Sequence, residues 1–140
     1  MLSALNTRAA EDASECITIF VDPLNNVWVA WSGNTLTRVF VMNSTLDITI
    51  TAPTTFDTFD AYNITGVGYG AYAVIFYDEL GTIDSLGHYP NAITHYSIVL
   101  QNGTNPGGRE LFNRSAALQS KAFLVSKNGY ELGTVLLTHD

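Results

Sequence analysis

The stretch YNITGVGYGAYAVIFYDE at positions 62–79 is where residue types and spacing come closest to a chemical motif. Gly66, Gly68 and Gly70 alternate with other residues, as in a loop that cradles a phosphate group. A dinucleotide fingerprint, however, has its third glycine one residue later and then enters a helix, whereas β-branched and aromatic residues follow here. We therefore interpret the glycines as the entrance of a β-strand, where they permit a bulge, a bend or the close approach of another backbone.

Large aromatic rings in and around this stretch could stack on the faces of sugars. In an extended strand, Tyr72 and Tyr77 fall on opposite faces, since side chains alternate along it. Rings on both faces favour a core or a subunit interface, with a sugar-binding face as the alternative. The candidate interface or ligand residues are Trp28, Trp31, Tyr62, Tyr69, Tyr72 and Tyr77.

Three acids at the end of this stretch and beyond it give a weak pattern for a metal site. Asp78, Glu79 and Asp84 supply the hard oxygen donors that Ca²⁺ prefers, but their spacing does not match an EF-hand loop. We interpret them as solvated loop carboxylates and expect no cofactor. The 3 histidines are scattered and form no zinc-binding array, and no G-x-S-x-G nucleophile elbow is present. The sequence therefore predicts no catalytic residues and no enzyme.

The charge balance excludes several partner classes. The formal net charge is −7, and no Lys or Arg occurs between Arg38 and Arg109. Binding to nucleic acid or to an anionic membrane surface requires clustered cations, which this chain lacks. We therefore expect neither nucleic acid nor membrane as a partner.

Composition indicates a single globular domain. The chain has 140 residues, of which 46% are hydrophobic and only 14% charged. Its lone Cys16 implies no internal disulfide, and we expect it to be a buried, inert thiol. The amino terminus lacks the apolar core of a signal peptide, so synthesis in a cytoplasm is expected. We expect an N-terminal arm or short helix over 1–15 and one domain over 16–140.

Alternating apolar residues separated by turn signals predict an all-β fold. We expect an antiparallel β-sandwich or open barrel of about seven or eight short strands. In 46–51, Leu46, Ile48 and Ile50 are expected to face the core. After Pro53, residues 54–66 are expected to form a loop or irregular edge, 101–108 a loop, and 109–120 a short helix. The predicted strands are 16–21, 27–32, 37–43, 46–51, 69–79, 92–100, 121–126 and 130–137, with Asn128-Gly129 as a hairpin turn between the last two.

These features favour a structural or assembly protein over a ligand-binding module. The small, motif-free chain is similar in composition to phage structural proteins. We expect a virion accessory, decoration or fibre subunit that forms a homo-oligomer, or contacts other subunits, through β-strands and the arm. The alternative is a lectin-like β-sandwich that binds glycans through its Tyr and Trp rings.

Overall fold

The structure is a computed structural model that describes residues 16–33, 36–58, 61–79, 81–82, 84–87, 90–113, 117–126 and 130–138, with side chains as far as Phe112. The described residues form strands and connections and include no helix. None of them therefore provides a helix long and apolar enough to cross a membrane. The predicted arm over 1–15 lies outside the described residues.

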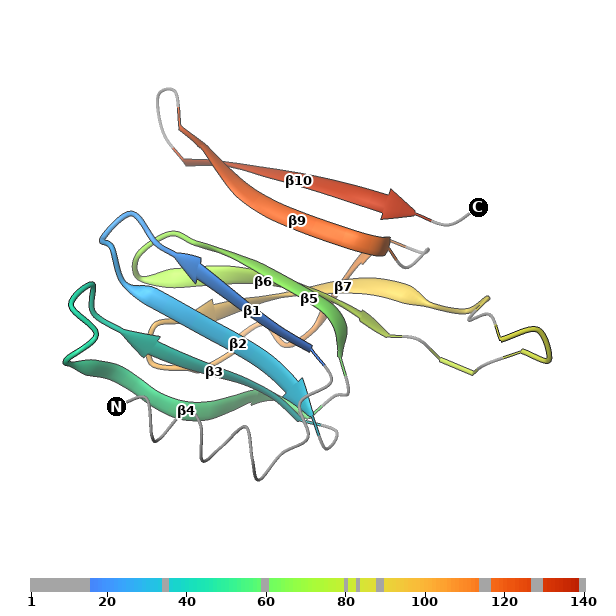
Figure 1. Cartoon of the computed structure of the whole chain (residues 1–140), viewed down its shortest axis with the longest axis horizontal. Coiled ribbons are helices and arrows are strands. Elements are labelled where there is room, and N and C mark those ends of the chain that lie inside the picture. The colour runs from blue at the N-terminus through green and yellow to red at the C-terminus, as the bar shows by residue number, and fades with distance from the viewer. Residues whose placement is uncertain are drawn as a thin grey trace.

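The described strands form two antiparallel four-stranded sheets and a two-stranded ribbon (Figure 1). In each four-stranded sheet the strands follow one another in chain order. Sheet A contains β1 (Cys16–Val21), β2 (Val27–Gly33), β3 (Leu36–Met42) and β4 (Thr49–Asp57). Sheet B contains β5 (Tyr62–Gly68), β6 (Tyr72–Glu79), β7 (Ile93–Leu100) and β8 (Glu110–Asn113). The ribbon contains β9 (Ala117–Ser126) and β10 (Tyr130–Thr138).

The main core lies between the two sheets, consistent with the predicted β-sandwich. Alternate residues of the central strands supply it, because successive side chains of a strand point to opposite faces. The opposite faces that we predicted for Tyr72 and Tyr77 are confirmed, since Tyr77 lies in this core with Ala73 and Ile75. The buried core consists of Trp28, Ala30, Val39, Val41, Phe56, Ala61, Ile64, Ala73, Ile75, Tyr77 and Val99.

Each sheet also carries apolar residues on the face turned away from this core. On sheet A these form a separate buried cluster of Val29, Trp31, Phe40 and Met42. On sheet B they are Val67, Val74 and Phe76, with Tyr69 and Tyr96 packed against them. Both sheets are therefore apolar on two faces, which is unusual for antiparallel sheets, since their outer face is commonly polar.

Of the three roles that we predicted for the alternating glycines, the structure shows the close approach of another segment, at Gly66 and Gly68. They lie within a separate strand, β5, rather than at the entrance of the strand predicted over 69–79. A Cβ at Gly66 would overlap the Phe20 ring, and a Cβ at Gly68 would lie 2.5 Å from the Cβ of Asp22. Both partners belong to the end of β1 and the turn after it. The expected close approach of another chain segment is confirmed, and it joins sheet A to sheet B along β1 and β5.

The prediction of a helix over 109–120 is wrong. Glu110–Asn113 forms β8, Ala117–Ser126 forms β9, and residues 114–116 lie outside the described residues. β8 pairs with the edge of β7, at Thr94, His95 and Tyr96. Unpaired backbone groups at a sheet edge need partners, and this pairing outweighs a local helical pattern. In place of the loop or irregular edge predicted over 54–66, β4 extends to Asp57 and β5 begins at Tyr62. With β5 and β8 added, the described residues form ten strands rather than about seven or eight.

The predicted strand over 46–51 is also displaced. Residues 43–48 form a turn in which Leu46 has a φ of 59°, and Ile48 is 60% exposed rather than facing the core. The side-chain carbonyl of Asn43 accepts hydrogen bonds from the backbone amides of Asp47 and Ile48, both at 3.2 Å. Such side-chain-to-backbone bonds compete with strand pairing. β4 therefore begins only at Thr49.

Candidate functional site

The six predicted aromatic residues divide by burial. Trp28 and Tyr77 are 0% exposed and Trp31 is 2% exposed, so these rings are held within the subunit. Trp28 donates from Nε1 to Oδ2 of Asp22 at 2.9 Å, which satisfies its polar atom in the core. Tyr62 and Tyr69 are half-buried, and Tyr72 is 36% exposed. The structure therefore does not bring the six rings together on one surface.

Tyr69 and Tyr72 do form a pair, at the tip of the β5–β6 hairpin. Their rings stack with centroids 5.0 Å apart and planes 10° from parallel. The backbone amide of Tyr69 donates to the carbonyl of Tyr72 at 2.7 Å, and Gly70 has a φ of +93° that allows the tight turn. Burial raises the pKa of the Tyr69 phenol. This pair, together with the half-buried Tyr62, is the part of the predicted ligand face that remains accessible.

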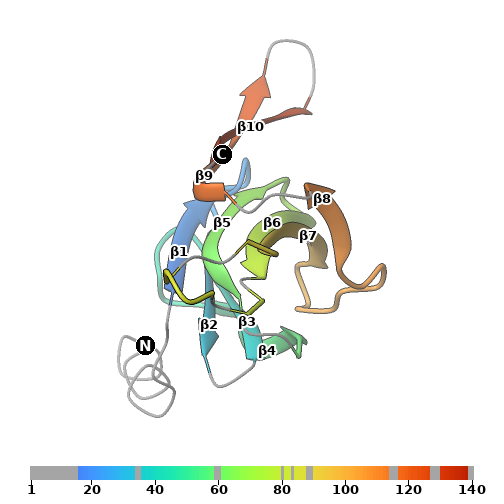
Figure 2. The same cartoon turned by 90° about the vertical axis from the view of Figure 1, so that its right-hand side faces the viewer.

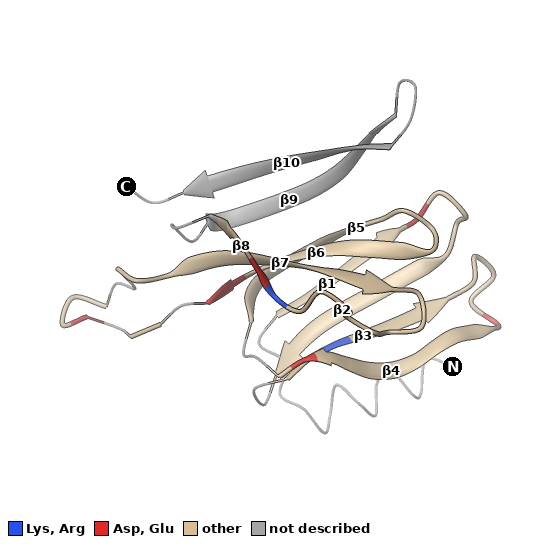
Figure 3. Cartoon of the chain, turned by 180° about the vertical axis from the view of Figure 1, so that it is seen from behind, with Lys and Arg blue, Asp and Glu red and all other residues tan. Residues whose placement is uncertain are grey.

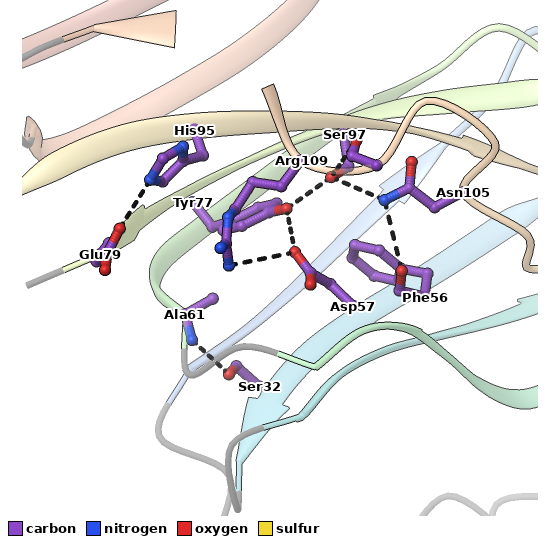
Figure 4. A network of polar contacts seen from close by, with 11 residues as sticks. Ser32, Phe56, Asp57, Ala61, Tyr77, Glu79, His95, Ser97, Asn105 and Arg109 are labelled. Atoms are coloured by element: carbon purple, nitrogen blue, oxygen red, sulfur yellow. Dashed lines mark hydrogen bonds and ion pairs between the residues drawn. The ribbon is translucent and has the colours of Figure 1, made fainter. Parts of the chain in front are cut away.

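The phenol of Tyr77 is the centre of a buried polar network (Figure 4). It donates to Oδ2 of Asp57 at 2.7 Å and lies 2.6 Å from Oγ of Ser97. Nδ2 of Asn105 donates to that same Oγ at 3.1 Å, and Nη1 of Arg109 lies 3.8 Å from Oδ2 of Asp57. Since each hydroxyl carries one proton, the short distances define one direction: Asn105 to Ser97, Ser97 to Tyr77, and Tyr77 to the Asp57 carboxylate.

The chemistry of this network favours a structural role. Burial raises the pKa of Tyr77 well above its ordinary value, and the hydrogen bond to Asp57 raises it further. The phenol therefore stays protonated at neutral pH and acts as a hydrogen-bond donor. Ser97 is 0% exposed, so its hydroxyl is not accessible to a substrate. The network fastens the end of β4 to β6 and β7.

A strap formed by residues 101–109 extends this connection along β4 from Thr51 to Asp57. The segment is a loop, as predicted, and it runs in the same direction as β4 while contacting it at intervals. Gly103 has a φ of +86°, and a Cβ there would lie 2.8 Å from Thr54. In order along the strap, Gln101 accepts a hydrogen bond from Thr51, Gly103 packs on Thr54, Asn105 donates to the carbonyl of Phe56, and Arg109 pairs with Asp57.

The acids of the weak calcium pattern have partners within the chain, and the prediction of solvated loop carboxylates is wrong for Asp78, which is buried in β6. Asp78 is 1% exposed and accepts hydrogen bonds from Asn63 at 3.0 Å and Thr94 at 2.6 Å. Glu79 lies 3.0 Å from Nε2 of His95, and Asp84 accepts from the amide of Leu86 at 2.8 Å. Across the part of the chain that the structure describes, no three His, Cys, Asp or Glu residues form a group that could hold a metal ion.

Cys16 is half-buried, and its thiol donates to the carbonyl of Ala61 at 3.0 Å. This contact joins the start of β1 to the residue before β5. We predicted a buried thiol, and the side chain is only partly buried. The residue adds to the β1–β5 connection made by the glycines.

Sequence reasoning missed an apolar stripe on β1. Ile17, Ile19 and Val21 are 54%, 63% and 56% exposed. They pair with Trp31, Val29 and Val27 of β2, so they continue the outer apolar face of sheet A to its β1 edge. We call these three residues the β1 stripe. Its signal was present in the sequence, because CITIFV is apolar at nearly every position and so predicts two apolar faces.

Comparisons of the chain with protein-family models, with curated proteins and with solved structures find no match.

Proposed function

We propose that this chain is a non-enzymatic structural or assembly protein, whose copies associate through the apolar side chains exposed on β1, at the edge of sheet A, as in a subunit of a virus particle or another large assembly. The observation that carries the proposal is the β1 stripe, three large apolar side chains that are each more than half exposed. Contiguous exposed apolar residues on a folded chain commonly mark an interaction surface. Two copies related by a two-fold axis would cover the stripe with its own equivalent.

The distribution of charge supports this association. The described acidic residues lie in connections and at strand ends, as Figure 3 shows in red. Neither the stripe nor its β2 neighbours carry a charged side chain. Copies of a chain with a net charge of −7 can therefore meet at this face without placing like charges in direct contact.

The absolute mass of the native particle, measured by light scattering on a sizing column, tests the proposal. We expect a symmetric oligomer for the unaltered chain and a smaller particle for Ile19→Asp, because a buried carboxylate in the interface would lack a partner. The matched control is Leu86→Asp, which places the same group at a loop position that is 77% exposed. A monomer at high concentration, or equal masses for both variants, would contradict the proposal.

The stacked tyrosines favour a second candidate, a lectin-like module. Tyr72 presents an accessible ring at the hairpin tip, where a sugar face could stack on it. A glycan-array screen with the unaltered chain and Tyr72→Ala separates the candidates. Glycan binding that Tyr72→Ala abolishes would support the lectin, and no binding by the unaltered chain would exclude it for the glycans on the array.

A further inference from the structure

The ribbon leaves one long strand edge without a partner among the described strands. β10 pairs with β9 and with no other described strand. Figures 1 and 2 both show the ribbon standing off from the two sheets, with β9 nearer to β5 and β10 beyond it. β10 has nine residues, and along the edge away from β9 its backbone amide and carbonyl groups require partners. An isolated two-stranded ribbon is also only marginally stable.

β4, the edge of sheet A, shows how this chain protects a strand edge elsewhere. It contains Pro53, which lacks a backbone donor, and the strap of 101–109 runs along it. β10 has the sequence YELGTVLLT, with no proline, no lysine and Glu131 as its sole charged residue. It therefore lacks the residues that commonly prevent pairing with another chain.

We propose that β10 pairs antiparallel with β10 of a second copy of this chain, about a two-fold axis at Thr134. This inference rests on the proposed function, self-association, and assigns it a second contact surface. The two ribbons then join into one continuous sheet, by the addition of strands at an open edge. Antiparallel pairing of a strand with itself is isologous, so each copy gains one partner at this edge, while the β1 stripe supplies the contact to a further copy.

The position of Glu131 in the strand favours antiparallel pairing over parallel pairing. Parallel pairing in register would set Glu131 beside its own copy, and like charges directly opposite each other are destabilising. The antiparallel register that pairs all nine residues sets Glu131 opposite Leu137 and Thr134 opposite itself. The two Glu131 positions are then separated by about 20 Å along the sheet, at about 3.4 Å per residue. That distance exceeds the screening length of about 8 Å in physiological salt.

Cysteine cross-linking tests both the contact and its register. Thr134→Cys places a thiol opposite itself, where neighbouring Cβ atoms of paired strands come within reach of a disulfide. We expect mild oxidation to convert most of this variant to a covalent dimer on a non-reducing gel. The control Thr138→Cys makes the same substitution in the same strand, but its two copies lie opposite Tyr130 and far from each other. The unaltered chain gives the background from Cys16.

A charge-exchange experiment covers the case in which the cysteine variants fail to fold. Thr134→Lys and Thr134→Glu each set like charges opposite each other, so either variant alone should associate up to about fivefold more weakly than Thr138→Lys. A mixture of the two should regain association at the level of the unaltered chain, since opposite charges then meet.

The outcomes separate this inference from the proposed function. Cross-linking at Thr134 but not at Thr138, or recovery in the mixture, supports the pairing. An oligomer that Ile19→Asp dissociates, but that cross-links at neither or equally at both positions, overturns the β10 pairing and leaves the proposed function standing. A monomeric unaltered chain overturns both.

Discussion

Along one side of the molecule β1 meets β5, and along the other side β4 meets the strap and the ends of β6 and β7. The first junction, the glycine seam, depends on absent side chains: Gly66 and Gly68 leave space for Phe20 and Asp22. The second junction, the polar seam, depends on hydrogen bonds from the Tyr77 network and the strap. Two sheets of similar size are thus joined by steric fit on one side and by polar contacts on the other.

The two seams differ in how well each can accommodate a substitution. At the glycine seam, Asp22 is fixed because its carboxylate accepts four hydrogen bonds, including those from the amides of Leu24 and Asn26. The neighbouring Phe20 ring stacks on Trp28, at 6.0 Å between centroids. Neither partner can move without losing these contacts. The polar seam is made of several bonds of moderate strength, so loss of one leaves the others in place.

We expect the largest effect at the glycine seam. The new Cβ of Gly68→Ala would lie 2.5 Å from the Cβ and 3.0 Å from the Cα of Asp22, so the backbone of one strand must shift. Overpacking of this kind should lower the free energy of unfolding by about 3 kcal/mol, measured by urea denaturation. The control is Gly107→Ala in the strap, where nothing lies within 4 Å, and we expect a change below about 0.5 kcal/mol. Equal losses for the two variants would show that close approach does not join the sheets.

The next effect is expected at the polar seam. Tyr77→Phe removes the phenol that bonds to Asp57 and Ser97 but preserves the ring in the core. Because a hydrogen bond to a charged group is lost and the carboxylate stays half-buried, the free energy of unfolding should fall by about 2 kcal/mol. The control Tyr72→Phe removes a phenol from a ring that is 36% exposed and should change stability by less than about 0.5 kcal/mol. A decrease in the free energy of unfolding as small as that of the control would mean that the network contributes little to stability.

High pH should weaken the polar seam selectively. The pKa of Tyr77 is raised in the folded chain by burial, whereas in the unfolded chain it is about 10. The stability that this shift contributes is complete below pH 10 and is lost as the pH rises, because only the unfolded phenol then releases its proton. Relative to Tyr77→Phe, the unaltered chain should lose about 1.4 kcal/mol per pH unit above pH 10. Urea denaturation of both proteins between pH 8 and 11 measures the difference, and parallel curves would contradict it.

The glycine seam was partly predictable from the sequence, and the polar seam was not. Alternating glycines before an apolar run indicate close approach of a neighbour, and Gly66 and Gly68 confirm it. The pattern does not identify the contacting residues, because Phe20 and Asp22 lie more than forty positions earlier in the chain. The strands in 16–42 were predicted from runs of β-branched and aromatic residues between turn signals, and β1 matches its predicted limits.

The polar seam was hidden because its members have no local signature. Asp57 was assigned to a loop, Tyr77 to a core or interface, and Asn105 and Arg109 to the strap and a helix that does not form. Only the sheet pairing brings these residues together, at separations of up to about fifty positions. The helix prediction at β8 was wrong for the same reason, because pairing with the edge of β7 determines the conformation of this segment.

The smallest effect should come from the ion pair at the surface of the polar seam. Nη1 of Arg109 lies 3.8 Å from the Asp57 carboxylate, and the arginine side chain is 34% exposed. Arg109→Gln keeps a polar side chain but removes the charge, so it should lower the free energy of unfolding by about 0.5 kcal/mol in dilute buffer. Because salt screens partly exposed pairs, the difference from the unaltered chain should shrink in 1 M NaCl, where the screening length is about 3 Å.

The same ion pair also allows a test of whether Arg109 and Tyr77 contribute to stability independently of each other. If Arg109 acts mainly by holding the Asp57 carboxylate against Tyr77, the effects of Arg109→Gln and Tyr77→Phe should not add. The double variant should then be more stable than the sum of the two single losses predicts, by up to about 0.5 kcal/mol, which is the whole effect of Arg109→Gln. Full additivity, together with a loss that high salt does not reduce, would place Arg109 outside the network and leave Asp57, Tyr77, Ser97 and Asn105 as the whole of the polar seam.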